Sequence, residues 1–235
     1  MPTKNPSGTL YIVATPIGNL EDITLRALKI LREADAIICE ELRVGSSLLK
    51  RLGIEAKEII LLNEHNEEDQ ATQIAARLVQ GQTMALISDT GTPVFADPGH
   101  LLISVASGFG VRVSPVPGAN SIIAALSLLD FKLEQFVFGG FLPREPEKRR
   151  AELTRLRGLR MPVVLMDTPY RLGALLDDVA KTFGPGQPVT VACDLTQPGE
   201  IIYRGGAASV RKQVNQKKAE FILIVHGPPG GSRSR

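Results

Sequence analysis

Thr9-Leu-Tyr-Ile-Val-Ala-Thr15 is a short apolar run that predicts a β-strand, and it opens the stretch of sequence that decides the fold. The segment from Ile23 to Arg32 follows with apolar residues at helical spacing, and Asp22 is placed to cap its start. Ala36-Ile-Ile-Cys39 then predicts a second strand. A strand, a helix and a strand in this order are typical of an α/β protein with a mainly parallel sheet.

The same alternation continues to about residue 113. Ser114-Pro-Val-Pro-Gly118 then interrupts it, because two prolines and a glycine end a strand and do not continue as a helix. A second series of short apolar runs and helical patterns follows. We therefore expect two α/β domains, with an N-terminal domain at 1–113, a linker at 114–118, a C-terminal domain at 119–228 and a flexible tail at 229–235.

Composition places the chain among soluble globular proteins. Its 235 residues are 43% hydrophobic and 22% charged, which excludes disordered and fibrous classes. Cys39 and Cys193 have no CxxC partner, so a disulfide scaffold and a metal site are not expected, and a reducing cytoplasm fits best. No apolar run approaches the roughly 18 residues of a membrane span, so we expect neither secretion nor membrane insertion.

The net charge of +2 is unevenly distributed along the chain. Residues 1–110 hold 9 Lys or Arg against 14 Asp or Glu, whereas the remainder holds 18 basic and 11 acidic residues. A basic half could bind a polyanion, and the asymmetry is also compatible with ordinary surface variation.

The loops that follow strands hold small, turn-forming residues. Neither GxGxxG nor GxxxxGK[ST] is present, which disfavours a dehydrogenase and a P-loop NTPase. The loops are Thr15-Pro-Ile-Gly-Asn19, Ser88-Asp-Thr-Gly-Thr-Pro93 with Ala96-Asp-Pro-Gly99, and Pro115-Val-Pro-Gly-Ala-Asn-Ser121. In open α/β sheets, ligands bind beyond the carboxyl ends of strands, and such loops let the backbone approach a ligand closely. Each loop by itself could also be a plain tight turn.

Together these loops resemble the tetrapyrrole methylase superfamily, and within it the ribosomal small-subunit methyltransferase I type, which are cytidine 2′-O-ribose methyltransferases. Further matching motifs are Asp22-Ile-Thr-Leu-Arg-Ala-Leu28, Glu64-His-Asn66, Pro117-Gly118, Gly140-Phe-Leu-Pro143 and Arg204-Gly205. The resemblance implies two α/β domains of the tetrapyrrole methylase type, S-adenosyl-L-methionine held in the cleft between them, a small-subunit rRNA substrate and a homodimer.

The resemblance also implies which residues contact the cofactor. In the N-terminal half they are Pro16, Asp89, Gly91, Thr92, Pro93 and Phe95, followed after the Pro-Gly turn by Ser121 and Ile122. In the C-terminal half they are Met166, Asp167, Cys193, Leu195 and Val225. For Cys193, Leu195 and Val225, plain packing in the core is the alternative, because apolar residues at strand ends are usually buried.

Methyl transfer from a sulfonium needs alignment, and it is assisted by a carboxylate or imidazole that accepts the proton of the ribose hydroxyl or by a cation that stabilises the developing alkoxide. The candidates are Glu40, Arg43, Glu64, His65, Asn66 and Arg171. Glu40 and Arg43 could equally form a structural ion pair, and His65 could be an exposed, inert residue.

Basic residues between 144 and 160 are candidates for RNA binding. We select Arg144, Lys148, Arg149 and Arg150, although a solvated amphipathic helix would have a similar composition.

Three substrate-side segments depart from the pattern of the family, namely Glu40-Glu-Leu-Arg43, Met166-Asp-Thr-Pro-Tyr-Arg171 and Cys193-Asp-Leu-Thr-Gln197. Two alternatives therefore stay open beside rRNA methylation. One is a methylase of another acceptor, such as a tetrapyrrole or another RNA, and the other is a non-catalytic protein that binds S-adenosylmethionine and associates with the ribosome.

Overall fold

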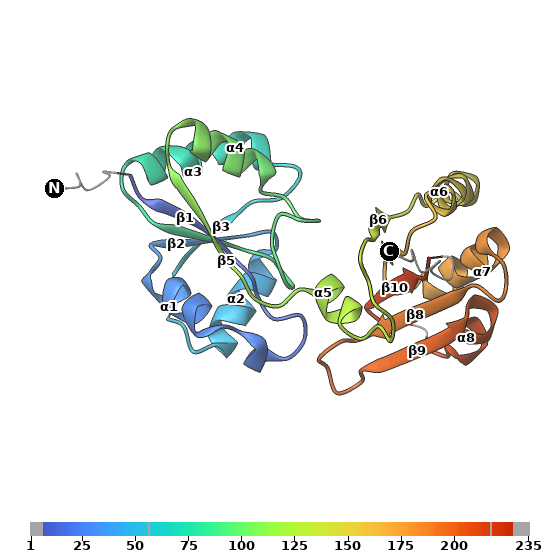
Figure 1. Ribbon diagram of the computed structural model, residues 1–235. Helices are drawn as coiled ribbons and strands as arrows, with labels where there is room; N and C mark the ends of the chain where they lie inside the picture. The colour runs from blue at the N-terminus through green and yellow to red at the C-terminus, as the bar shows by residue number, and fades with distance from the viewer. Residues whose placement is uncertain (1–6, 56, 217, 228–235) are drawn as a thin grey trace, which may run out of the picture. The chain divides into compact units, whose positions relative to one another are not determined.

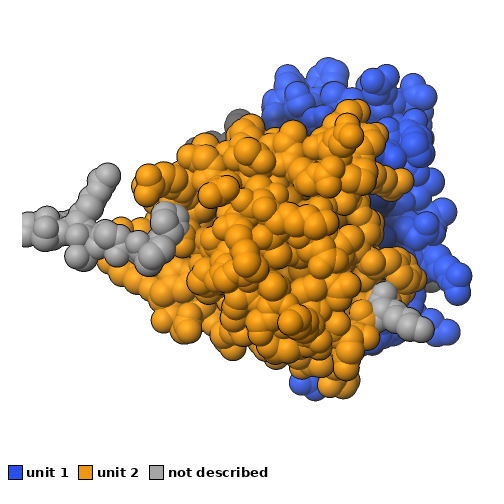
Figure 2. Space-filling model, turned by 90° about the vertical axis from the view of Figure 1, so that its right-hand side faces the viewer, with its two compact units in different colours: residues 1–120 blue, residues 121–235 orange. Residues whose placement is uncertain are grey.

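The chain forms two compact units, residues 1–120 and residues 121–235 (Figure 2). Each unit is built around its own five-stranded sheet, whose strands Figure 1 draws as arrows. The computed structural model describes residues 7–55, 57–216 and 218–227. The expected tail at 229–235 lies outside the described residues.

The sheet of the first unit is entirely parallel, as predicted, with the order β3-β2-β4-β1-β5. Its strands are β1 (Thr9–Val13), β2 (Ala36–Cys39), β3 (Glu58–Leu61), β4 (Met84–Ile87) and β5 (Arg112–Val116). Its helices are the 3-10 helix η1 (Leu20–Asp22), α1 (Leu25–Glu33), α2 (Leu42–Arg51), α3 (Glu67–Val79) and α4 (His100–Gly108).

Helices cover both faces of this sheet, so strands β2 and β4 are apolar at every position. Ile37 packs with α1 and α2 on one face, whereas the next residue, Ile38, packs with α3 and α4 on the other (Figure 1). All four residues of β2 and of β4 are buried. This two-sided burial explains why these strands appear in the sequence as short continuous apolar runs.

Two local details of the first unit differ from expectation. Thr24, not Asp22, caps α1, since its hydroxyl accepts the Ala27 N–H at 3.1 Å, while Asp22 lies in η1. Helix α2 was not predicted, because Gly45 lowers helix propensity. A Cβ at Gly45 would lie 2.8 Å from Cys39 Sγ, so the glycine permits close packing of α2 on β2.

The second unit has a mixed sheet with the order β6-β7-β10-β8-β9. Its strands are β6 (Val137–Phe141), β7 (Val163–Met166), β8 (Pro188–Cys193), β9 (Ile201–Gly206) and β10 (Phe221–Val225). Its helices are α5 (Ser121–Leu126), α6 (Pro146–Gly158), α7 (Leu172–Phe183) and α8 (Ala207–Gln213).

The expectation of a mainly parallel sheet is wrong for this second unit. Among its neighbouring strands only β6 and β7 form a parallel pair, whereas β10 is antiparallel to both β7 and β8, and β8 and β9 form an antiparallel pair. The main core lies between the sheet and helices α6, α7 and α8.

The segment 114–118, expected to be a linker, is a strand over its first three residues. Ser114, Pro115 and Val116 belong to β5, and the division between the units falls after Asn120. Strand β5 is at the edge of its sheet, where a proline that cannot donate a hydrogen bond is tolerated.

Candidate cofactor and active site

The carboxyl edge of the first sheet brings together the predicted site residues of the first unit. Because all five strands are parallel, the loops that follow them meet at one edge. Pro16 follows β1, Glu40 follows β2 and Glu64 follows β3. The segment from Asp89 to Phe95 follows β4. The expectation that these residues lie close together agrees with the electrostatic coupling of Glu40 to Asp89 and Glu64.

Thr15 joins the loop after β1 to the loop after β4. Its backbone N–H donates to the Gly91 carbonyl at 2.8 Å, and its buried hydroxyl donates to the Ser88 carbonyl at 3.1 Å. Ser88 Oγ in turn accepts the Thr90 N–H at 3.1 Å. Thr15 was not among the predicted site residues, although its position directly before Pro16 is the sequence signal that could have identified it.

The loop after β4 is also tied to the end of the unit. Thr92 Oγ1 donates to the Ala119 carbonyl at 3.2 Å and accepts from the Asn120 side chain at 3.3 Å. Gly91 has φ +78°, and a Cβ there would lie 3.1 Å from Ile17. Val94 has φ +73°, which is strained for a β-branched side chain. Such strain is typical of loops that serve a binding or catalytic role.

Two carboxyl groups at this edge are held toward their protonated forms. The pKa of Glu40 is raised by burial and then by the neighbouring carboxylates of Asp97, Asp89, Glu64 and Glu41. The pKa of Asp89 is also raised, chiefly by burial, although a backbone hydrogen bond from Glu41 acts in the opposite direction. Raised carboxyl pKa values of this kind are suited to proton transfer near neutral pH.

The other predicted catalytic residues of this unit lie in more open surroundings. Glu64 and His65 are exposed, and the His65 ring nitrogen lies 3.6 Å from the Glu64 carboxylate. Arg43 is exposed at the start of α2, and among the described residues it forms no ion pair with Glu40. The Asn66 amide donates to the Leu61 carbonyl at 3.1 Å, which shapes the turn that carries His65.

Glu67 is a buried carboxylate that sequence reasoning missed. Its Oε1 accepts the backbone N–H groups of Gly99, Leu101 and Leu102 at 2.9, 2.9 and 3.4 Å. These are free amides at the start of α4, whose own N-cap, Gly99, has no side chain to bind them. Glu67 thereby fixes the end of the segment 88–99 from a different helix.

Of the five cofactor residues predicted between Met166 and Val225, four lie at one edge of the second sheet. Met166 ends β7 and Cys193 ends β8, and both residues pair with the first residues of β10. Asp167 and Leu195 follow these two strand ends. Cys193 is fully buried, and burial raises the pKa of its thiol to about 12, so its side chain belongs to the core rather than to an open site.

The prediction for Val225 is contradicted by the topology. Val225 is fully buried and pairs with Val163 and Val189, which begin β7 and β8. It therefore lies at the opposite edge of the sheet from Met166. The antiparallel direction of β10 is the physical reason, since it reverses the end of the strand that faces the site.

Asp167 and Arg171 form an ion pair at the site edge. Arg171 Nη1 lies 3.1 Å from Asp167 Oδ1, and Nη2 donates to the Pro143 carbonyl at 3.4 Å. The other oxygen, Asp167 Oδ2, is buried and has no hydrogen-bond partner among the described residues. Asp89 Oδ1 in the first unit is likewise buried and has no hydrogen-bond partner among the described residues. Unpartnered buried oxygens of this kind fit a ligand that brings its own donors.

The structure does not leave Arg149 available to RNA. Its side chain is buried, with Nε 2.7 Å from Asp178 Oδ2 and Nη1 2.8 Å from the Arg144 carbonyl. Arg144, Lys148 and Arg150 are exposed, as the RNA-binding prediction requires. Helical spacing separates Arg149 from its neighbours: one face of α6 packs on α7, and the two flanking residues project away from it.

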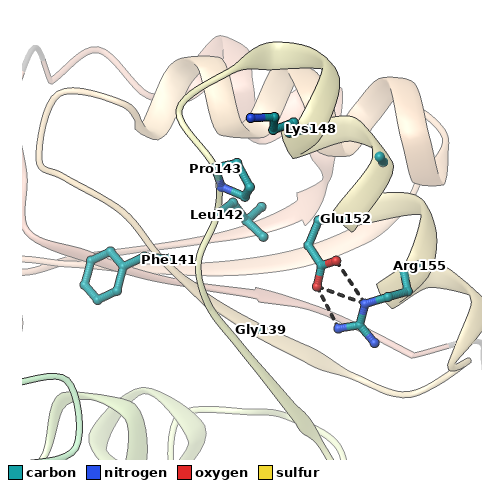
Figure 3. A pocket seen from close by; sticks show the side chains of 8 residues that line it. Gly139, Phe141, Leu142, Pro143, Lys148, Glu152 and Arg155 are labelled. Carbon is teal, nitrogen blue, oxygen red and sulfur yellow. Dashed lines mark hydrogen bonds and ion pairs between the residues drawn. The ribbon is translucent and has the colours of Figure 1, made fainter.

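An open pocket of about 570 Å³ lies between β6 and α6. Leu142, Pro143 and Ala151 provide apolar walls, and Arg155 donates three hydrogen bonds to the Glu152 carboxylate (Figure 3). The ring of Phe141 points to the other side of the β6 segment from Glu152 and Arg155 (Figure 3). The pocket is therefore bordered by Lys148 and Arg155 on α6 and by Phe141 at the end of β6.

Residues 7–55, 57–216 and 218–227 hold neither a membrane-spanning helix nor a cluster of metal ligands. No helix there combines the length and the hydrophobicity needed to cross a bilayer. In the same ranges, no three His, Cys, Asp or Glu side chains are grouped so that they could bind a metal ion.

Comparison with known proteins identifies the family. Residues 9–210 match the family model of the tetrapyrrole (corrin/porphyrin) methylases. The chain belongs to the tetrapyrrole methylase family. It is accordingly an α/β methyltransferase that uses S-adenosylmethionine.

Two curated relatives of this methylase are ribosomal RNA small subunit methyltransferases I. The one from Xylella fastidiosa (strain Temecula1 / ATCC 700964) is 42% identical over 224 residues, which cover 94% of this chain and 82% of the relative. The one from Escherichia coli O157:H7 is 38% identical over 227 residues, covering 95% and 79%.

Solved structures show the same methylase fold. Cobalt precorrin-4 methyltransferase, a cobalamin biosynthetic enzyme, matches with a TM-score of 0.70 at 20% identity and covers 95% of this chain and 97% of its own. Diphthine synthase matches with a TM-score of 0.69 at 14% identity and covers 94% and 90%. At these identities the likeness concerns the fold alone.

Proposed function

We propose that this methylase transfers a methyl group from S-adenosylmethionine to the 2′-hydroxyl of a cytidine in small-subunit ribosomal RNA. The ribosomal RNA small subunit methyltransferases I among its relatives support this substrate class. The observation that supports the chemistry is the raised pKa of Glu40, a partly buried carboxyl. Glu40 lies at the same edge of the sheet as the segment from Asp89 to Phe95. We further propose a cytoplasmic homodimer, on the resemblance of the motifs to the family.

Glu40 is the proposed general base. When bound, the cofactor would supply an electrophilic methyl group on a sulfonium, to which the ribose oxygen would be directed. Glu40 accepts the proton of the hydroxyl, and its raised pKa makes it a stronger base than an exposed glutamate. Arg43, Glu64, His65 and Arg171 are proposed to orient the RNA or to stabilise charge near the ribose.

Both units are proposed to contribute to cofactor binding. In the first unit the residues are Pro16, Asp89, Gly91, Thr92, Pro93 and Phe95, held by the Thr15 and Thr92 hydrogen bonds. In the second unit they are Ser121 and Ile122 at the start of α5, together with Met166, Asp167 and Leu195 and the backbone at Cys193.

Replacing Asp89 by alanine is expected to weaken cofactor binding about 10- to 100-fold, because a charge-assisted hydrogen bond to the ligand is lost. Isothermal titration with S-adenosylmethionine measures this. Asp69→Ala is the matched control, since it removes an exposed carboxylate from α3. An unchanged affinity for the Asp89→Ala protein would refute the assignment of this loop.

Replacing Glu40 by glutamine is expected to lower kcat for rRNA methylation about 100-fold or more, with the affinity for the cofactor unchanged. The purified protein is offered labelled S-adenosylmethionine with small ribosomal subunits, free rRNA or a precorrin. Label at a cytidine ribose of the small-subunit RNA is the expected product. Label in the precorrin alone, or cofactor binding without transfer to any acceptor, would overturn the proposed substrate.

A further inference from the structure

Two aromatic rings are exposed at the carboxyl edge of the second sheet. Phe141 ends β6 and is 56% exposed, and Tyr170 lies in the turn after β7 and is 71% exposed. Strands β6 and β7 are adjacent and parallel, and Phe141 is the register partner of Met166. Both rings are therefore carried by neighbouring loops of one edge. Large aromatic side chains are normally buried, so two that are exposed in this way indicate an interaction surface.

A β-bulge sets the direction of Phe141. The register between β6 and β7 shifts between Phe138 and Gly140, so that Gly139 is an extra residue in β6. Without it, the alternation of side chains would turn Phe141 toward α6 and the core. With it, the ring lies on the other side of β6 from Glu152 and Arg155 (Figure 3). Gly140, with φ +62°, supplies the backbone conformation that the shift requires.

Tyr170 carries a cation on its face. Lys218 Nζ lies 5.6 Å from the centre of the Tyr170 ring, within the range of a cation–π interaction. The Ala219 N–H donates to the Pro169 carbonyl at 3.1 Å, which holds the segment that bears Lys218 beside the turn. On the other flank, Arg171 reaches the Pro143 carbonyl at 3.4 Å and so links the Tyr170 turn to the loop that follows Phe141.

The charges around the two rings favour an anionic partner. Arg144 follows Phe141 by three residues, is exposed and forms no ion pair among the described residues. Of the nearby carboxylates, Asp167 is paired with Arg171 and Glu145 with Lys148 at 2.9 Å, whereas Glu220 is coupled electrostatically to Lys218. Exposed aromatic faces interleaved with free cations are the combination by which proteins bind single-stranded nucleic acid. A partner that made only apolar contacts would place no negative charge beside Arg144 and Lys218.

We propose that Phe141 and Tyr170 form a stacking platform for unpaired bases of the RNA substrate, with Lys218 and Arg144 bound to the phosphates that flank those bases. This inference rests on the proposed function, and it adds that the substrate is bound as a single strand with unstacked bases. The platform consists of these four residues. Phe141 also borders the pocket between β6 and α6, although its ring lies on the other side of β6 from Glu152 and Arg155 (Figure 3).

The test measures the affinity of the protein for a fluorescently labelled single-stranded RNA and for a duplex of the same sequence. Phe141→Ala and Tyr170→Ala are each expected to weaken binding of the single strand about 5- to 100-fold, the range for loss of one stacked base. Tyr170→Phe keeps the ring and is expected to bind like the parent. Phe109→Ala removes a ring of similar exposure from the first unit, 63% exposed at the end of α4, and is expected to have no effect.

Salt dependence separates stacking from charge. Phe141→Ala is expected to leave the slope of log affinity against log salt unchanged, whereas Arg144→Ala reduces it by about 0.7. Equal losses for the duplex and the single strand, or Phe141→Ala and Tyr170→Ala proteins that bind like the parent, would overturn the platform. A change from dimer to monomer in Phe141→Ala on sedimentation would overturn it in favour of a protein interface.

The outcome is independent of the proposed reaction. Methylation of small subunits by the parent protein tests the proposed function. RNA binding by the Phe141→Ala, Tyr170→Ala, Tyr170→Phe and Arg144→Ala proteins tests this inference. If the parent protein methylates small subunits but the Phe141→Ala and Tyr170→Ala proteins bind RNA as tightly as the parent, the platform is refuted and the proposed function is not.

Discussion

Replacing Arg149 by alanine is expected to lower the free energy of unfolding of the second unit by about 3–5 kcal/mol. The side chain is only 7% exposed, and its Nε lies 2.7 Å from Asp178 Oδ2. Removing one member of a buried pair leaves the other charge without a partner in a medium that solvates it poorly. The guanidinium also binds the Arg144 carbonyl at 2.8 Å, so the start of α6 loses a second restraint.

Hydrogen exchange of the β10 amides measures this effect, because those amides are buried in the second unit and report its own stability. Arg150→Ala is the matched control. It removes the neighbouring arginine, which is exposed, and is expected to change the stability by less than about 0.5 kcal/mol. The double change Arg149→Met with Asp178→Leu is expected to recover most of the loss, since two apolar residues leave no buried charge. Equal protection in the Arg149→Ala and Arg150→Ala proteins would contradict the assignment.

The contrast between Arg149 and Arg150 shows what sequence could and could not provide. Composition indicated a basic segment correctly, and three of its four selected residues are exposed. Which arginine turns inward depends on Asp178, 29 residues away on α7. A pairing over that distance leaves no local pattern, because either arginine could have matched the carboxylate until the packing of α6 on α7 is known.

The two candidate site edges also differ in how far the sequence could predict them. In the first unit a parallel sheet was predicted from the alternation of strands and helices, and the rule that carboxyl ends share an edge placed Glu40 with Asp89. In the second unit the rule applied to Met166 and Cys193 but not to Val225, because β10 runs antiparallel to its neighbours. Strand direction is set by the length of the connections and by tertiary packing, and a five-residue apolar run looks the same in either direction.

Replacing Glu67 by alanine is expected to lower the stability of the first unit by about 2–4 kcal/mol and to weaken cofactor binding as well. Glu67 is 7% exposed and accepts three backbone N–H groups at the start of α4. Alanine leaves those donors without an acceptor at the positive end of the helix. The loop 88–99 ends at the same amides, and a Cβ at Gly99 would lie 2.8 Å from Leu86, so this turn has little room to rearrange.

Two variants decide whether Glu67 acts through its buried contacts. Glu67→Gln keeps an acceptor oxygen without the charge, so it is expected to recover about half of the loss in stability. Glu68→Ala removes the adjacent, exposed carboxylate from the same first turn of α3 and is expected to cost less than about 1 kcal/mol, the size of a helix-dipole contribution. Urea unfolding and isothermal titration with S-adenosylmethionine supply the two readouts. If Glu67→Ala lowers stability while cofactor affinity is retained, Glu67 caps α4 without ordering the loop, and its link to the binding site is wrong.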